Sequence, residues 1–123
     1  MSAGEGEAEK AVYVGQNNAK TQRFEKGHAA ISKLHNRKFD QLRKQIYFGC
    51  ITIVDEDENS FPLDWLPDDK IQDAILTSVE HQLIFKLQPE LNDIGKQKLL
   101  AQMPISLQVQ NMCASRFLDC QTL

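Results

Sequence analysis

Two prolines, Pro67 and Pro89, bracket the stretch of this chain whose structure is most tightly constrained. Proline fits the first turn of a helix and breaks a helix interior. Asp68 and Asp69 follow Pro67, where acidic groups favour the positive end of the helix dipole. Apolar residues then recur every three or four positions. The pattern predicts a helix over about residues 67–87, with its apolar stripe at Ile71, Ala74, Ile75, Val79, Leu83 and Leu87.

A second helical pattern lies upstream of this one. Its apolar residues also fall on one stripe, which is formed by Phe24, Ile31, Phe39, Leu42 and Ile46. We therefore expect a long, basic, amphipathic helix over about residues 20–47, paired with the helix over 67–87 as a hairpin. In that hairpin, Arg43 and Lys44 would approach Asp68 and Asp69.

The C-terminal third of the chain fits two structures. Asn92 can cap a short helix that ends before Pro104. The residues after Pro104 alternate like a strand over 105–110 and also fit a helical face, so periodicity alone does not decide between the two. Because helices precede this segment, we expect an all-α fold with one or two shorter C-terminal helices. The alternative is a small α+β fold in which short strands near 50–54 and 105–110 pair.

A chain of 123 residues can form one domain with a single core. Its first residues, MSAGEGEAEK, are small or acidic and can bury little apolar surface. We expect a flexible acidic tail over residues 1–16 and a single helical domain over 17–123. An acidic connector is expected at 55–66.

The connector forms most of the stretch DEDENSFPLDWLPDD, residues 55–69, which carries the only tryptophan. Its start resembles a calcium-binding loop, but Ser60 and Leu66 stand where such a loop needs glycine and glutamate. Large apolar side chains flanked by acids suit docking into an apolar groove with a basic rim. They could equally fold back over the protein's own core. The candidate partner-binding residues are Phe61, Leu63, Trp65 and Leu66.

The net charge of −3 hides a basic segment over residues 20–44. On the expected helix, five of its basic residues would form a line that could follow phosphates or an acidic protein surface. The segment lacks interleaved aromatic residues, and the overall charge is negative, so nucleic acid and membrane are disfavoured as partners. The candidate residues for binding a polyanion or an acidic surface are Arg23, Lys26, Lys33, Arg37 and Lys44.

The chain lacks the phosphate-binding, dinucleotide-binding, zinc-protease, serine-hydrolase and CxxC motifs. We therefore expect no enzyme activity, no catalytic residues, no cofactor and no metal site. Three cysteines without CxxC spacing favour a reducing compartment, the cytoplasm or the nucleus. The function we expect is that of a non-catalytic structural or adaptor subunit of a larger intracellular protein assembly. Its partners would be other protein subunits, in a hetero-complex or a homo-oligomer. The alternative is a polyanion-binding module for RNA, DNA or anionic lipid.

Overall fold

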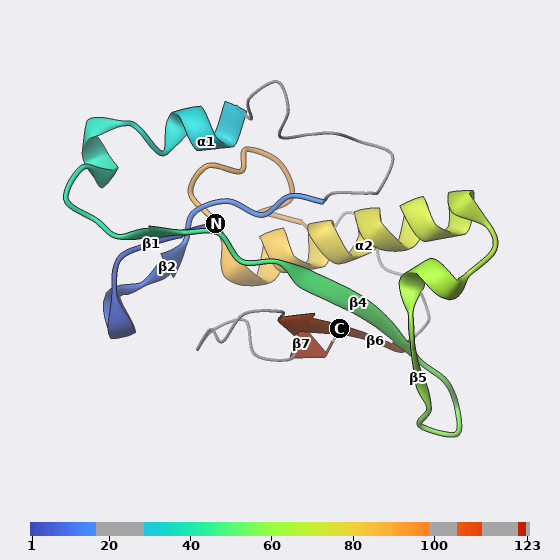
Figure 1. The fold of residues 1–123 in the computed structure, drawn as a ribbon. Helices are drawn as coiled ribbons and strands as arrows, with labels where there is room; N and C mark the ends of the chain where they lie inside the picture. The colour runs from blue at the N-terminus through green and yellow to red at the C-terminus, as the bar shows by residue number, and fades with distance from the viewer. Residues whose placement is uncertain (17–28, 99–105, 112–120, 123) are drawn as a thin grey trace.

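A computed structural model describes residues 1–16, 29–98, 106–111 and 121–122. It contains two antiparallel sheets and one main helix, so the fold is α+β (Figure 1). The elements in chain order are β1 (Ser2–Ala3), η1 (Gly6–Ala8), β2 (Lys10–Ala11), α1 (Ala29–Lys33), η2 (Arg37–Phe39), β3 (Lys44–Gln45), β4 (Gly49–Val54), β5 (Ser60–Pro62), η3 (Leu63–Trp65), α2 (Asp69–Leu87), β6 (Ser106–Asn111) and β7 (Gln121–Thr122).

The larger sheet overturns the expectation of an all-α fold and confirms the α+β alternative. Its strand order is β5-β4-β6-β7, and β4 pairs with β6 in a register that runs from Gly49 opposite Asn111 to Val54 opposite Ser106. Tyr47 and Phe48 before β4 are aromatic, and residues 51–54 within it are β-branched, which suits a pleated, half-buried surface. The expected helix over the last segment is therefore wrong for 106–111, while residues 112–120 lie outside the described ranges.

The smaller sheet has the order β2-β1-β3 and includes residues expected to form the tail. Ser2 and Ala3 pair with β2 on one side and with Lys44 and Gln45 of β3 on the other. Ser2 has no exposed surface, and Ala3 is only 4% exposed. Small side chains thus allow the start of the chain to lie between two strands, although it offers little apolar surface.

The long helix over 20–47 is wrong for the part of this range that the structure describes, which begins at residue 29. There, α1 ends at Lys33, and the Asn36 side chain accepts a hydrogen bond from the Lys38 N–H to begin η2. Leu34 and Phe39 are both buried in one cluster, yet residues five apart lie on different sides of a continuous helix. The chain must therefore turn between them. Phe24 lies outside the described residues.

The helix expected over 67–87 is confirmed as α2, which spans Asp69–Leu87. The Asp68 carboxylate caps its first turn by accepting from the N–H groups of Lys70 and Ile71. At the other end, Gln88 adopts the left-handed conformation at φ 48°, and Pro89 follows. The shorter helix expected after Asn92 is absent over 92–98, and the remainder of it lies outside the described residues.

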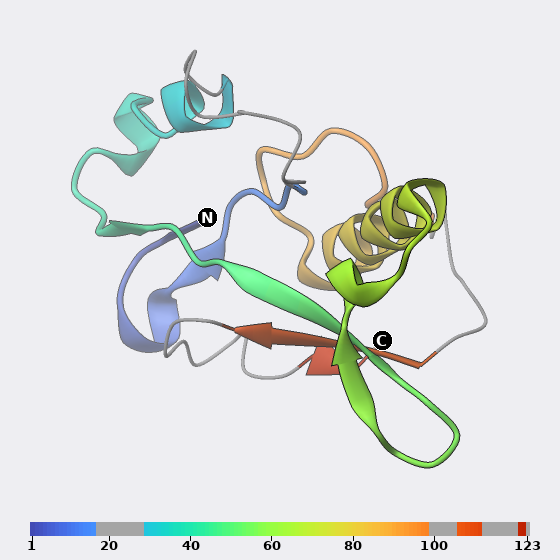
Figure 2. The ribbon, with the colours of Figure 1, turned by 45° about the vertical axis from the view of Figure 1, so that its right-hand side comes forward.

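Two apolar clusters hold these elements together. In the first, α2 lies over one face of the larger sheet, as Figures 1 and 2 show, and Ile75 is 1% exposed. The first cluster contains Leu63, Ile75 and Val79, with Ile51, Ile53, Leu66, Leu76 and Leu83 packed against them. The second lies at the smaller sheet and contains Ala3, Val12, Leu34 and Phe39, with Met1 and Leu91 packed against them. Within the described ranges, no helix has both the length and the apolar content to cross a lipid bilayer.

Candidate functional site

Residues 55–59, at the start of the acidic stretch, form the turn of the β4–β5 hairpin. The Asp55 N–H donates to the Asn59 carbonyl at 2.9 Å, and Glu58 adopts a φ of 62°. Asp55 Oδ1 accepts from the N–H groups of Asp57 (3.0 Å) and Asn59 (2.8 Å), and its Oδ2 accepts from Asn59 Nδ2 (3.2 Å). These bonds lower the pKa of Asp55, the side-chain bond from Asn59 most of all. The carboxylate therefore shapes the turn.

The four residues proposed for partner binding occupy different environments. Leu63 is 8% exposed and belongs to the first cluster, and Leu66 packs against that cluster. Phe61 is half-buried and lies opposite Ile53 in the register of β5 on β4. Trp65 differs from the other three because it is 72% exposed. Leu63 and Leu66 therefore cover the protein's own core, whereas Trp65 projects into solvent.

Trp65 projects from a turn that is held on both sides. Leu66 N–H donates to the Leu63 carbonyl at 3.1 Å, which closes η3. The side-chain amide of Gln72 on α2 donates to the Leu66 carbonyl and links the turn to the helix. With Leu63 and Leu66 packed in the core, the backbone on either side of Trp65 is fixed. A partner would thus meet Trp65 in a preorganised position, which lowers the entropy cost of binding.

The surroundings of Trp65 are acidic. Asp64, Asp68 and Asp69 are exposed, and Ile71 in the first turn of α2 is 47% exposed. We call residues 64–71 the Trp65 segment. It presents Trp65 and Ile71 among carboxylates, although Ile71 was expected on the apolar stripe of the helix.

The basic residues proposed for polyanion binding lie on separate elements. Lys33 ends α1, Arg37 begins η2, and Lys44 lies in β3; all three are exposed. Arg23 and Lys26 lie outside the described residues. The line of charges was drawn on one continuous helix, whereas the described part of that range, from residue 29 on, forms α1, η2 and β3. Polyanion binding therefore stays a prediction without its original geometric basis.

Exposed apolar side chains accompany these basic groups. Leu42 is 44% exposed, Ile46 is 43% exposed and Phe48 is 54% exposed. Exposure alternates from Lys44 to Phe48, with Gln45 and Tyr47 facing inward. We call residues 42–48 the basic–apolar segment. Sequence reasoning placed Leu42 and Ile46 in the core stripe of a helix and so missed this surface.

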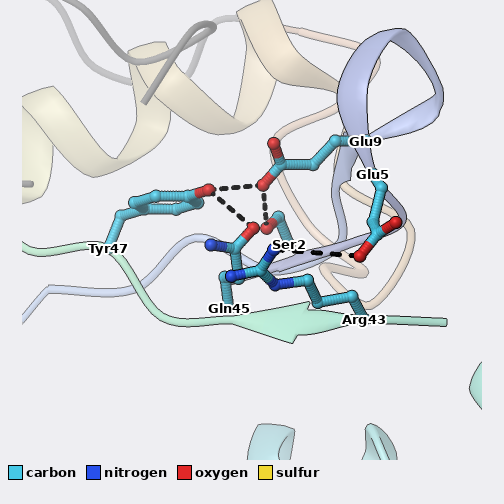
Figure 3. Close-up of polar contacts among 6 residues, drawn as sticks. All are labelled: Ser2, Glu5, Glu9, Arg43, Gln45 and Tyr47. Carbon is cyan, nitrogen blue, oxygen red and sulfur yellow. Dashed lines mark hydrogen bonds and ion pairs between the residues drawn. The ribbon is translucent and has the colours of Figure 1, made fainter. Parts of the chain in front are cut away.

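The inward side of the basic–apolar segment meets the start of the chain in a polar cluster (Figure 3). Glu9 Oε1 accepts from Ser2 Oγ at 2.6 Å and from the Tyr47 hydroxyl at 2.5 Å. Gln45 Oε1 lies 3.0 Å from the same hydroxyl, which has one hydrogen; the charged carboxylate is the stronger acceptor. Because Ser2 has no exposed surface, we interpret this cluster as a structural contact that holds the start of the chain against the basic–apolar segment. Residue spacing gave no sign of it.

No group of three or more potential metal ligands occurs among the described side chains. The comparisons with known proteins add no assignment. No protein-family model matches the chain, and neither the curated proteins nor the solved structures contain a significant match.

Proposed function

We propose that this chain is a non-catalytic adaptor or structural subunit that binds another protein through the Trp65 segment. The observation that supports this function is the 72% exposure of Trp65 on a turn anchored by the buried Leu63. A tryptophan can bury about 150–250 Å² on contact, and tryptophan is enriched among the residues that dominate binding energy. Its neighbours Asp64, Asp68 and Asp69 favour a partner surface with basic groups around an apolar pocket.

Substitution of Trp65 by alanine tests this function. Because most of the side chain is in solvent, we expect the free energy of unfolding to change by less than about 1 kcal/mol. Capture of the protein's partner in a quantitative pull-down should fall about tenfold or more. Ile94→Ala is a matched control, since Ile94 is 71% exposed in the loop after α2 and should leave capture unchanged. Equal capture by Trp65→Ala and the unsubstituted protein would reject the proposal.

Leu63→Ala separates binding from folding. Leu63 lies in the first cluster, so its truncation should lower stability by about 2–5 kcal/mol. A loss of several kcal/mol in Trp65→Ala as well would mean that Trp65 serves the core.

The same proposal places the protein in a reducing compartment, the cytoplasm or the nucleus. Cys50 supports this placement because it is a free and exposed cysteine at the start of β4. Fluorescence microscopy of the tagged full-length gene product tests it, and a signal confined to the secretory pathway would contradict it.

A further inference from the structure

Opposite charges collect at opposite ends of this molecule. Residues 55–73 contain eight acidic residues and one lysine. Residues 33–44 contain five basic residues and one aspartate, and the neighbouring strands of the smaller sheet, with the residues between them, add Lys10 together with Glu5, Glu7 and Glu9, so this end keeps a small positive charge. Glu5 lies 3.8 Å from Arg43 in an exposed ion pair. In both ribbon views, the β4–β5 hairpin and the start of α2 lie at one end, and α1 and the smaller sheet lie at the other (Figures 1 and 2). β3 therefore lies away from the start of α2, whereas the expected hairpin of two helices would have placed Arg43 and Lys44 beside Asp68 and Asp69.

Each charged end also exposes apolar side chains. Trp65 (72%) and Ile71 (47%) are exposed at the acidic end. Leu42 (44%), Ile46 (43%) and Phe48 (54%) are exposed beside Arg43 and Lys44. The two surfaces are thus complementary in charge, and both have apolar surface to remove from water. The basic–apolar segment has the chemistry expected of a partner for the Trp65 segment.

We propose that the Trp65 segment of one copy of this chain binds the basic–apolar segment of a second copy. This inference rests on the proposed function and names the partner as the chain itself. A contact across a two-fold axis would use both pairs of opposite surfaces at once and would close at a dimer. A head-to-tail contact pairs opposite charges and leaves one surface of each kind available for the next copy.

Two double variants test this arrangement, each with one end altered. Trp65→Ala with Asp64→Lys alters the acidic end, and Phe48→Ser with Lys44→Glu alters the basic end. Both avoid Asp68, which caps α2. Asp93→Lys with Ile94→Ala is the control, because it makes the same kinds of change at exposed positions of the loop after α2. Circular dichroism establishes that each variant folds before its mass is measured.

Sedimentation velocity at low salt measures the association of each protein. The unsubstituted protein and the control should show a mass that rises with concentration, and added salt should reduce it. Each double variant alone should associate about tenfold more weakly or not at all. An equimolar mixture of the two should form a complex of one copy of each, because the mixture restores one intact pair of surfaces. Growth of the unsubstituted protein beyond a dimer separates the head-to-tail contact from a two-fold one, which closes at two copies.

Two results would overturn the inference: a monomeric unsubstituted protein at every concentration tested, or association that both double variants retain. Different results would contradict the proposed function. If the protein stays monomeric while Trp65→Ala abolishes capture of a different protein, self-association is wrong and the adaptor function stands. If association is lost in the double variants but neither association nor capture responds to Trp65→Ala alone, the role of Trp65 is wrong.

Discussion

The side-chain amide of Asn92 pairs with the backbone of Val14 as a neighbouring strand would. Val14 N–H donates to Asn92 Oδ1, and Asn92 Nδ2 donates to the Val14 carbonyl, both at 2.9 Å. Leu91 N–H donates to the Val12 carbonyl at 2.8 Å and extends the contact by one more bond. These bonds hold the first residues of the chain against the loop that follows α2, beside the cluster in which Val12 and Leu91 pack.

Asn92→Ala removes both amide bonds and leaves a partly buried N–H and carbonyl of Val14 without them. We expect the free energy of unfolding to fall by about 1–3 kcal/mol. Urea denaturation measures this loss as a lower midpoint at an unchanged slope. Asp93→Ala, at the exposed neighbouring position, should change stability by less than about 0.5 kcal/mol. Equal effects of the two substitutions would show that the amide bonds contribute nothing.

Tyr47→Phe deletes the hydroxyl that donates to Glu9 and keeps the ring. A hydrogen bond to a charged group contributes about 1.5–3 kcal/mol, so we expect a loss in that range. In a Glu9→Ala background the same substitution should cost less, because the charged acceptor is gone and only the neutral Gln45 Oε1 remains within reach of the hydroxyl. Thermal or urea unfolding of the four proteins of this cycle gives the coupling energy. A coupling energy of zero would contradict the role of the pair.

The sequence predicts correctly those elements whose signals are local. Pro67, Asp68 and Pro89 mark the ends of α2 to within two residues, because capping and proline effects act inside a single turn. The β-branched residues of β4 and the alternation over 105–110 indicate the β4–β6 pair as an alternative. Choosing between strand and helix needed the pairing partner, which lies more than fifty residues away in the chain.

The expected helix over 20–47 failed because spacing alone cannot show which residues are buried. Leu42 and Ile46 fitted its apolar stripe but are exposed, whereas Leu34 lay off the stripe and is buried. Asn36 was the available signal, since its side chain competes for backbone hydrogen bonds inside a helix. The sequence identifies Trp65 as a candidate because it is the only tryptophan. It does not predict that Trp65 is exposed, because this depends on Leu63, and not Trp65, packing in the core.

Ile75 and Ile71 allow one substitution to be compared at a buried and an exposed position of α2. Ile75 is 1% exposed and Ile71 is 47% exposed. Ile75→Ala should lower the free energy of unfolding by about 2–5 kcal/mol. Ile71→Ala should cost less than about 1 kcal/mol, since alanine also favours the helix. Chemical denaturation of both proteins measures the difference, and similar losses would contradict the placement of α2 on the sheet.

Glu58 holds a left-handed conformation, at φ 62°, in the turn of the β4–β5 hairpin. Glycine adopts this region without the steric cost of about 1–2 kcal/mol that a Cβ imposes. After the greater entropy of glycine in the unfolded chain is subtracted, Glu58→Gly should stabilise the protein by about 0.5–1 kcal/mol. Glu56→Gly removes the same charge from the same turn at a residue without positive φ and should destabilise it. Melting temperatures distinguish the two, and destabilisation by both would refute the strain at Glu58.

The pH dependence of the hairpin follows from Asp55. The side-chain bond from Asn59, followed by the backbone N–H bonds, holds the pKa of Asp55 below its ordinary value of 3.8. The folded state therefore binds this proton less readily than the unfolded chain does. The stability contributed by the Asp55 carboxylate is fully present above about pH 3.8 and is lost as pH falls through the folded pKa.

NMR titration of the Asp55 carboxyl measures that pKa directly. Asn59→Ala removes the largest cause and should raise the pKa toward 3.8, whereas Glu56→Gln, which makes no bond to this carboxylate, is the control. A pKa of Asp55 that Asn59→Ala leaves unchanged would show that the turn does not depend on this side-chain bond.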